Sequence, residues 1–101
     1  MNRREYLDTA MRIVCDDRPN IHGDVNDCFN LIAAHWSTFL GHRFNQDLKL
    51  SGADVAVLMT LFKLSRLQIN SKHADNVVDG IGYLALAGEL QDYAQWTMPQ
   101  E

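Results

Sequence analysis

The segment from residue 55 to residue 67 is apolar on almost every face of a helix, and this feature most constrains the fold. Its apolar members are Val55, Val57, Leu58, Met59, Leu61, Phe62, Leu64 and Leu67. A helix that is hydrophobic all round is buried at the centre of a fold or under a partner chain. The chain has only 101 residues, so it has little spare surface with which to cover this helix. We therefore expect a homo-oligomer.

Three further segments place apolar residues at helical spacing. The first covers residues 3–15. The second follows Asp24, a residue type that caps helix N-termini well, and is expected to end at Gly41, which suits a left-handed position. The last covers roughly residues 75–94. No segment has a convincing strand pattern.

Ser51 and Asp54 have the spacing of a capping box and should start the helix that contains residues 55–67. Short connections make successive helices antiparallel neighbours. The sequence therefore predicts a single all-α domain over residues 1–101, built as an antiparallel bundle of four main helices.

Composition and charge exclude several classes of function. The hydrophobic share of 47% and the charged share of 22% are ordinary for a soluble globular protein. The net charge of −4 argues against general nucleic-acid binding, which needs a basic face. No signal peptide or membrane span is expected, so we expect a cytoplasmic protein. Cys15 and Cys28 lack metal-ligand spacing and are expected to be reduced core residues.

Nine polar residues flank the apolar segments and should converge in such a bundle. They are Arg18, His22, Asp24, Lys63, Arg66, His73, Asp75, Asn76 and Asp79. In an up-down-up-down arrangement, the junctions before the second and the fourth helix share one end with the last turns of the third. This end is therefore the candidate site.

The same residues allow two kinds of ligand. Basic side chains and two helix N-termini could hold a phosphate or another anion. The basic residues concerned are Arg18, Lys63 and Arg66. Carboxylates could instead hold a divalent cation. These carboxylates are Asp24, Asp75 and Asp79.

Purely structural roles are the alternative for several of these residues. Asp24 and Asp75 can be helix caps, and Arg66 can pair with Asp75 or Asp79 across the helix hairpin. Lys63 can extend to the bundle end along an apolar helix. Tyr83, which continues the stripe of Asp75 and Asp79, can be a core aromatic.

Two groups of motifs resemble a family of small phage and prophage proteins of unassigned function. The first is Arg18-x-x-x-His22-Gly23-Asp24, followed by Phe29-x-x-Ile32-Ala33-x-x-Trp36-x-x-x-Leu40. The second is Lys63-Leu64-x-Arg66 with His73-x-Asp75-x-x-x-Asp79-x-x-Gly82-Tyr83. The resemblance covers roughly residues 5–90. That family is similar to the all-α nucleotide pyrophosphohydrolases of the MazG type, in which acidic residues hold Mg²⁺ against a nucleoside triphosphate.

The resemblance implies a MazG-like fold and a site for a nucleotide or another phosphorylated small molecule. The ligand-binding candidates are Arg18, His22, Lys63, Arg66, His73, Asn76 and Tyr83, and the candidate Mg²⁺ ligands are Asp24, Asp75 and Asp79. The chain departs from the superfamily at Asn76, which stands where a metal-binding Glu is usual. The earlier Glu-x-x-Glu motif is reduced to Asp24-x-x-Asp27. Fewer carboxylates weaken metal binding.

Three hypotheses of function follow from this pattern. The first is a Mg²⁺-dependent hydrolase of nucleoside triphosphates. The second is a non-catalytic protein that binds or sequesters a nucleotide. The third is a protein that binds and inhibits a host defence protein, with a purely structural polar cluster. If the chain is phage-encoded, its location is the host cytoplasm.

Overall fold

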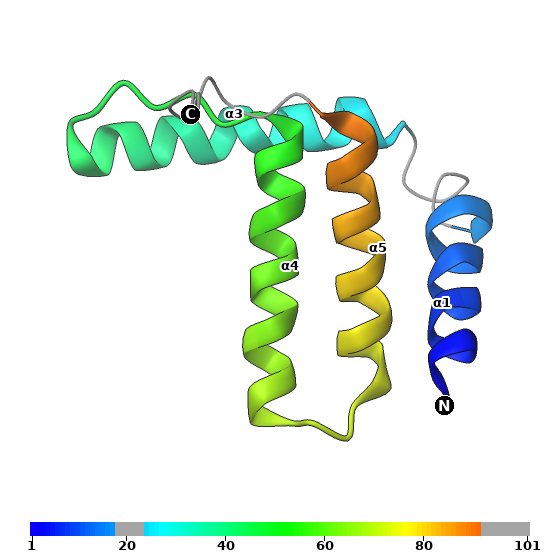
Figure 1. The fold of residues 1–101 in the computed structure, drawn as a ribbon. Coiled ribbons are helices and arrows are strands. Elements are labelled where there is room, and N and C mark those ends of the chain that lie inside the picture. The colour runs from blue at the N-terminus through cyan, green and yellow to red at the C-terminus, as the bar shows by residue number, and fades with distance from the viewer. Residues whose placement is uncertain (18–23, 92–101) are drawn as a thin grey trace, which may run out of the picture.

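The structure, a computed structural model, describes residues 1–17 and 24–91, and all of the regular secondary structure in these residues is helical. The elements are α1 (Arg3–Met11), the π-helical turn η1 (Arg12–Asp17), α3 (Val25–Phe44), α4 (Gly52–Ile69) and α5 (Ala74–Leu90). Figure 1 shows α4 and α5 as an antiparallel hairpin, with α3 across one end of it. The prediction of an all-α fold with four main helices is confirmed for the described residues.

Side-chain caps start the helices where the sequence indicated. The carboxylate of Asp24 accepts a hydrogen bond of 2.8 Å from the backbone N–H of Asn26. Ser51 and Asp54 form the predicted capping box, in which each side chain accepts from the backbone N–H of the other residue. Caps of this kind satisfy N–H groups that have no partner within the helix.

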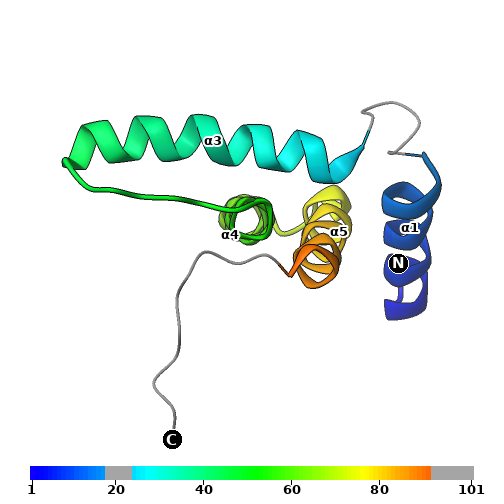
Figure 2. The same cartoon turned by 90° about the horizontal axis from the view of Figure 1, so that it is seen from above.

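α3 packs against the open end of the hairpin, where α4 begins and α5 ends. A Cβ atom added at the buried Gly52 would lie 3.0 Å from the side chain of Asn30 and 3.3 Å from that of Phe29, both in α3. It would also lie 3.6 Å from Leu90 at the end of α5. Figure 2 shows the C-terminal half of α3 extending past α4 on the side away from α5.

This crossing corrects the expectation that the two helix junctions share one end. The N-terminus of α3, with Asp24, lies at the open end of the hairpin, and the turn between α4 and α5 lies at the other (Figure 1). An 18-residue helix such as α4 is about 27 Å long, and this length separates Asp24 from the polar residues near the α4–α5 turn. Asp24 could lie beside the polar residues of the α4–α5 turn only if α3 ran along the hairpin. Instead, α3 runs across its open end.

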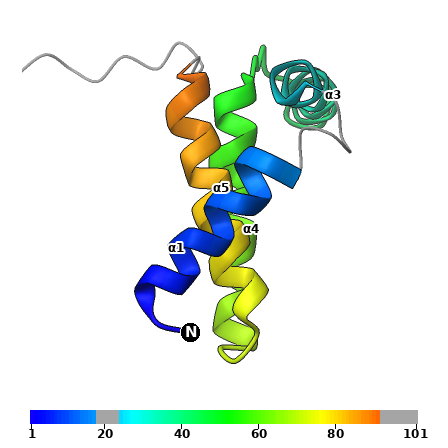
Figure 3. The same ribbon diagram turned by 90° about the vertical axis from the view of Figure 1, so that its right-hand side faces the viewer.

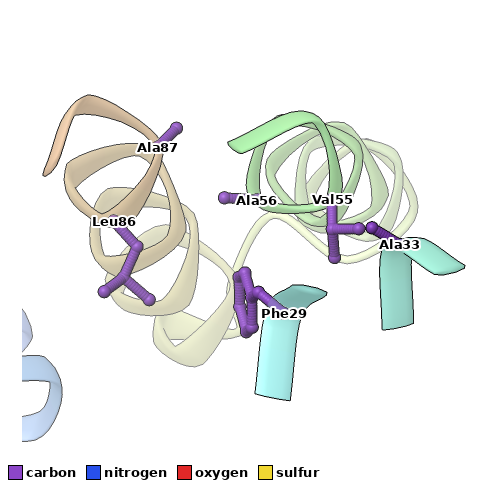
Figure 4. Close-up of a cluster of buried hydrophobic side chains, with 6 residues drawn as sticks. All are labelled: Phe29, Ala33, Val55, Ala56, Leu86 and Ala87. Carbon is purple, nitrogen blue, oxygen red and sulfur yellow. The ribbon is translucent and has the colours of Figure 1, made fainter. Parts of the chain in front are cut away.

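The hydrophobic core lies where the three longer helices meet, and small side chains dominate it. Figure 4 shows its six buried members, which are Phe29, Ala33, Val55, Ala56, Leu86 and Ala87. Ala56 and Ala87 lie between α4 and α5, so these helices approach closely. Val55 is the largest fully buried side chain in the described residues. Larger residues, including Trp36 and Leu90, pack against the cluster from its edges.

α1 packs beside α5, and its end departs from the predicted helix over residues 3–15 (Figure 3). From Arg12 onward the chain is π-helical, and a Cβ atom at Gly82 of α5 would lie 3.7 Å from the side chain of Val14. Cys15 is exposed, so the expectation of a core position is wrong for this residue. Cys28 is partly buried against the core, and both thiols are free.

The predicted end of the second helix at Gly41 is also wrong, because α3 continues to Phe44. The left-handed residue is Asn45, with φ of 53°. The backbone N–H groups of Asn45 and Gln46 both donate to the carbonyl of Gly41, so the chain turns back over that residue. A Cβ atom at Gly41 would lie only 2.8 Å from the carbonyl oxygen of Gln46. This glycine therefore permits a close backbone approach.

Alanine substitutions at two helical glycines should change stability in opposite directions. Gly41→Ala should lower the melting temperature, because the methyl group meets backbone that cannot move away cheaply. Gly88→Ala should raise it, because the added Cβ meets no atom within 4 Å from the described residues outside its own helical turns, and alanine favours a helix over glycine by up to about 1 kcal/mol. Thermal unfolding followed by circular dichroism measures both. Stabilisation by Gly41→Ala would contradict the described turn.

Candidate functional site

Lys63 and Asp79 form an ion pair between α4 and α5. The ammonium Nζ lies 3.0 Å from a carboxylate oxygen, and the side chains are only 14% and 22% exposed. Lys63 reaches α5 through this contact, and its Nζ also lies 5.8 Å from the ring centroid of the neighbouring Phe62. The pair thus gives Lys63 a structural role, and it occupies one of the three carboxylates that were predicted as magnesium ligands.

A partly open pocket of about 180 Å³ lies at the closed end of the hairpin. Its lining residues come from the last turn of α4, the turn and the first turn of α5. They are Arg66, Ile69, Asn70, His73 and Asn76. Three of the predicted ligand-binding residues, Arg66, His73 and Asn76, are therefore brought together. The sequence pattern did not single out Ile69 and Asn70, whose only signal is their position where the helix ends.

Asn70 holds the turn that shapes this pocket. Its backbone N–H donates to the carbonyl of Arg66 at 2.9 Å and ends α4. Its side-chain oxygen accepts from the backbone N–H of Lys72 at 3.3 Å, and its carbonyl accepts from that of His73 at 3.3 Å. His73 occupies the N-cap position of α5 but makes no side-chain cap hydrogen bond. The first-turn N–H groups of α5 thus end beside the pocket without a side-chain cap.

Arg66 keeps its positive charge uncompensated in the described part of the chain. The sequence left open a pair with Asp75 or Asp79, but no ion pair of Arg66 is found there, and Asp79 bonds Lys63 instead. The guanidinium carbon lies 5.6 Å from the ring centroid of Phe62. Such a contact orients a cation and neutralises none of its charge.

The three predicted magnesium ligands are not brought together within one chain. Asp24 caps α3 at the opposite end of the hairpin, and Asp79 pairs with Lys63. Asp75 is exposed in the first turn of α5, where a negative charge favours the helix dipole. Among residues 1–17 and 24–91, no group of three His, Cys, Asp or Glu side chains could hold a metal ion.

The remaining predicted ligand-binding residues lie apart from the pocket or outside the described residues. Tyr83 packs against the hydrophobic core, with its ring centroid 6.3 Å from that of Phe29. This position matches the alternative reading of a core aromatic. Arg18 and His22 lie outside the described residues.

Comparison with known proteins now places the chain in a family. Residues 5–91 match the family model described as "Domain of unknown function (DUF6378)". The chain belongs to this family. It is also similar to the Gene 55 protein of Mycobacterium phage L5, with 32% identity over 85 residues. That alignment covers 84% of this chain and 51% of the phage protein, so the chain spans about half the length of this relative.

The DUF6378 match and the phage relative confirm the phage-related part of the sequence prediction. They do not show a link to MazG-type enzymes, which stays an expectation. No solved structure matches the chain. Within the described residues, no helix is both long enough and apolar enough to span a membrane.

Breaking the Lys63–Asp79 pair should destabilise the fold. Asp79→Asn leaves a mostly buried ammonium without its carboxylate, so we expect a loss of roughly 1–3 kcal/mol in the free energy of unfolding. Adding Lys63→Met to Asp79→Asn should restore part of this loss, because no buried charge then remains. Urea denaturation of the parent, both single variants and the double variant measures the coupling. If the loss of unfolding free energy in the double variant equals the sum of the losses in the two single variants, Lys63 and Asp79 do not interact directly.

Proposed function

We propose that this DUF6378 protein binds the phosphate group of a small molecule, such as a nucleotide, in the pocket at the α4–α5 turn. The observation that carries the proposal is the charge of Arg66, which lines the pocket and has no carboxylate partner in the described residues. An arginine fork suits phosphate oxygens, with which it can form two parallel hydrogen bonds. The pocket therefore favours an anion over a cation.

The other groups at the pocket support the same choice of ligand. The N-terminus of the 17-residue α5 carries partial positive charge and has no side-chain cap, although the N–H of Asn76 donates to the carbonyl of His73. His73 and Asn76 add side chains that can donate hydrogen bonds. Asp75 opposes anion binding, because its negatively charged carboxylate lies in the first turn of α5. Because charges of both signs lie at the pocket, removing a positive charge and removing a negative charge should change the phosphate affinity in opposite directions.

The size of the pocket limits which part of a ligand it can hold. Pockets that enclose whole drug-sized ligands usually measure about 300–1,000 Å³. A volume of about 180 Å³ suits a phosphate group with its hydrogen-bonding shell and is too small for a base, a ribose and several phosphates. We therefore propose that the phosphate enters the pocket and that the rest of the ligand lies on the outer surface of the hairpin.

Binding without cleavage fits the residues better than hydrolysis. The resemblance to MazG-type enzymes implies a Mg²⁺ site, but Asp24 lies far from Asp75 and Asp79, and Asp79 is held by Lys63. The side chains present thus do not form a divalent-cation site within one chain. A phage-related protein that retains nucleotides in the host cytoplasm without consuming them is the function that we propose.

Replacing Arg66 should weaken phosphate binding and leave the fold intact. We expect Arg66→Gln to raise the dissociation constant for ATP or inorganic phosphate roughly ten- to a hundredfold, because a charge-assisted hydrogen bond contributes about 1.5–3 kcal/mol. Arg43→Gln is the matched control, because Arg43 is an exposed arginine in the last turn of α3. Isothermal titration calorimetry and thermal unfolding are measured on both variants. Equal affinities of parent and Arg66→Gln would contradict the proposal.

Replacing Asp75 should have the opposite effect on binding. Asp75→Asn removes a negative charge beside the pocket, so we expect tighter phosphate binding at low ionic strength and a smaller difference at high salt. The same samples are incubated with nucleoside triphosphates and Mg²⁺ or Mn²⁺, and products are separated by chromatography. Turnover by the parent that is lost in Asp75→Asn would contradict a purely binding role and favour the hydrolase hypothesis.

A further inference from the structure

The outer face of α4 carries a row of large apolar side chains that no described element covers. Leu58, Leu61, Phe62, Ser65 and Ile69 are spaced as one face of a helix, and we call them the α4 stripe. The four apolar members are 38%, 51%, 49% and 87% exposed, in chain order. Figure 1 shows α5 along one side of α4, while α3 crosses only the first turns of α4.

The composition of the core makes this exposure unusual. Five of the nine buried apolar residues in the described part of the chain are alanines, and only Phe29 and Leu86 are large. The side chains that normally supply most of a core are thus found on the surface of α4. Contiguous exposed apolar patches on soluble proteins mark sites of interaction. A chain of this length also has little other surface with which to cover them.

The charges around the stripe favour a second copy of the same chain as the occupant. An isologous contact brings the same patch of two copies together, so a charged patch would repel itself. The stripe itself carries no charge, although the chain has a net charge of −4. Asp54 lies on the same face one turn before Leu58, and Arg66 lies near the other end. An antiparallel arrangement would bring the acidic end of one stripe toward the basic end of the other.

The shape of the molecule supplies additional contact area beside the stripe. From Leu58 to Ile69 the stripe is about 17 Å long, which is short for an interface of about 800 Å² on each partner. The C-terminal half of α3 extends past α4 on the side away from α5 (Figure 2). It carries Phe39 and Phe44, which are 68% and 62% exposed. A second copy seated on the stripe would therefore also meet this part of α3.

From these observations we infer that the α4 stripe is the contact surface of an antiparallel homodimer. Ile69 belongs both to the stripe and to the lining of the pocket. The second copy therefore lies beside each pocket and narrows its open side. The dimer does not require the proposed ligand, because it is argued from the exposed apolar face and from the charges at its two ends.

The experiment measures the solution mass by light scattering after size-exclusion chromatography at micromolar concentration. The parent should have twice the chain mass of 11.5 kDa, and Leu61→Asp should have the mass of a single chain. Leu84→Asp is the matched control, because Leu84 is a leucine of α5 with a similar exposure of 58%. A monomeric parent, a dimeric Leu61→Asp variant, or dissociation by Leu84→Asp alone would overturn the inference.

A cross-linking experiment tests the same contact without an added charge. In a Cys15→Ser background, Ser65→Cys should form a covalent dimer with a short bismaleimide, because residue 65 lies within the stripe. Ser71→Cys, in the exposed turn at the end of the hairpin, should not. Because serine to cysteine changes little in size, folding of this variant is not at risk. Equal cross-linking of the two variants would overturn the inference even if the Leu61→Asp variant failed to fold.

Discussion

The close packing of α4 against α5 is the constraint on which the rest of the structure depends. Alanines at the contact let the two helix backbones approach, and the Lys63–Asp79 pair can form only because of that approach. The hairpin then offers one open end, which α3 covers through Phe29, and one closed end, which carries the pocket. Small side chains bring helices together but bury little apolar surface. The larger apolar residues of α4 are left facing outward.

Local signals in the sequence predicted the helices well, and the tertiary arrangement less well. Asp24 and the Ser51–Asp54 capping box marked true helix starts, because a cap acts within a few residues. The path of α3 depends on which residues pack at the open end of the hairpin, and no local pattern encodes that choice. Gly41 illustrates the limit. Its residue type predicted the left-handed position past the helix end, yet α3 continues to Phe44 and the left-handed residue is Asn45.

The candidate site was predictable where its residues are close in the sequence. Arg66, His73 and Asn76 flank one tight turn, so any helical hairpin brings them together. Asp24 was grouped with them only through the assumed direction of α3, and that grouping failed. The partner of Asp79 could not be chosen from sequence either, because Lys63 and Arg66 are one turn apart on α4. The structure selects Lys63, which leaves Arg66 available for a ligand.

The π-helical turn at Arg12–Asp17 has a consequence for how the length of this chain can change. A π-helical turn accommodates one more residue than the α-helix that it interrupts. Ala10, which is buried, lies in α1 before this turn. Loss of one residue between Arg12 and Asp17 would let the segment revert to a regular α-helix while α1 keeps its register. Val14 lies within this turn and contacts Gly82 of α5, so that contact is the one that such a deletion would change.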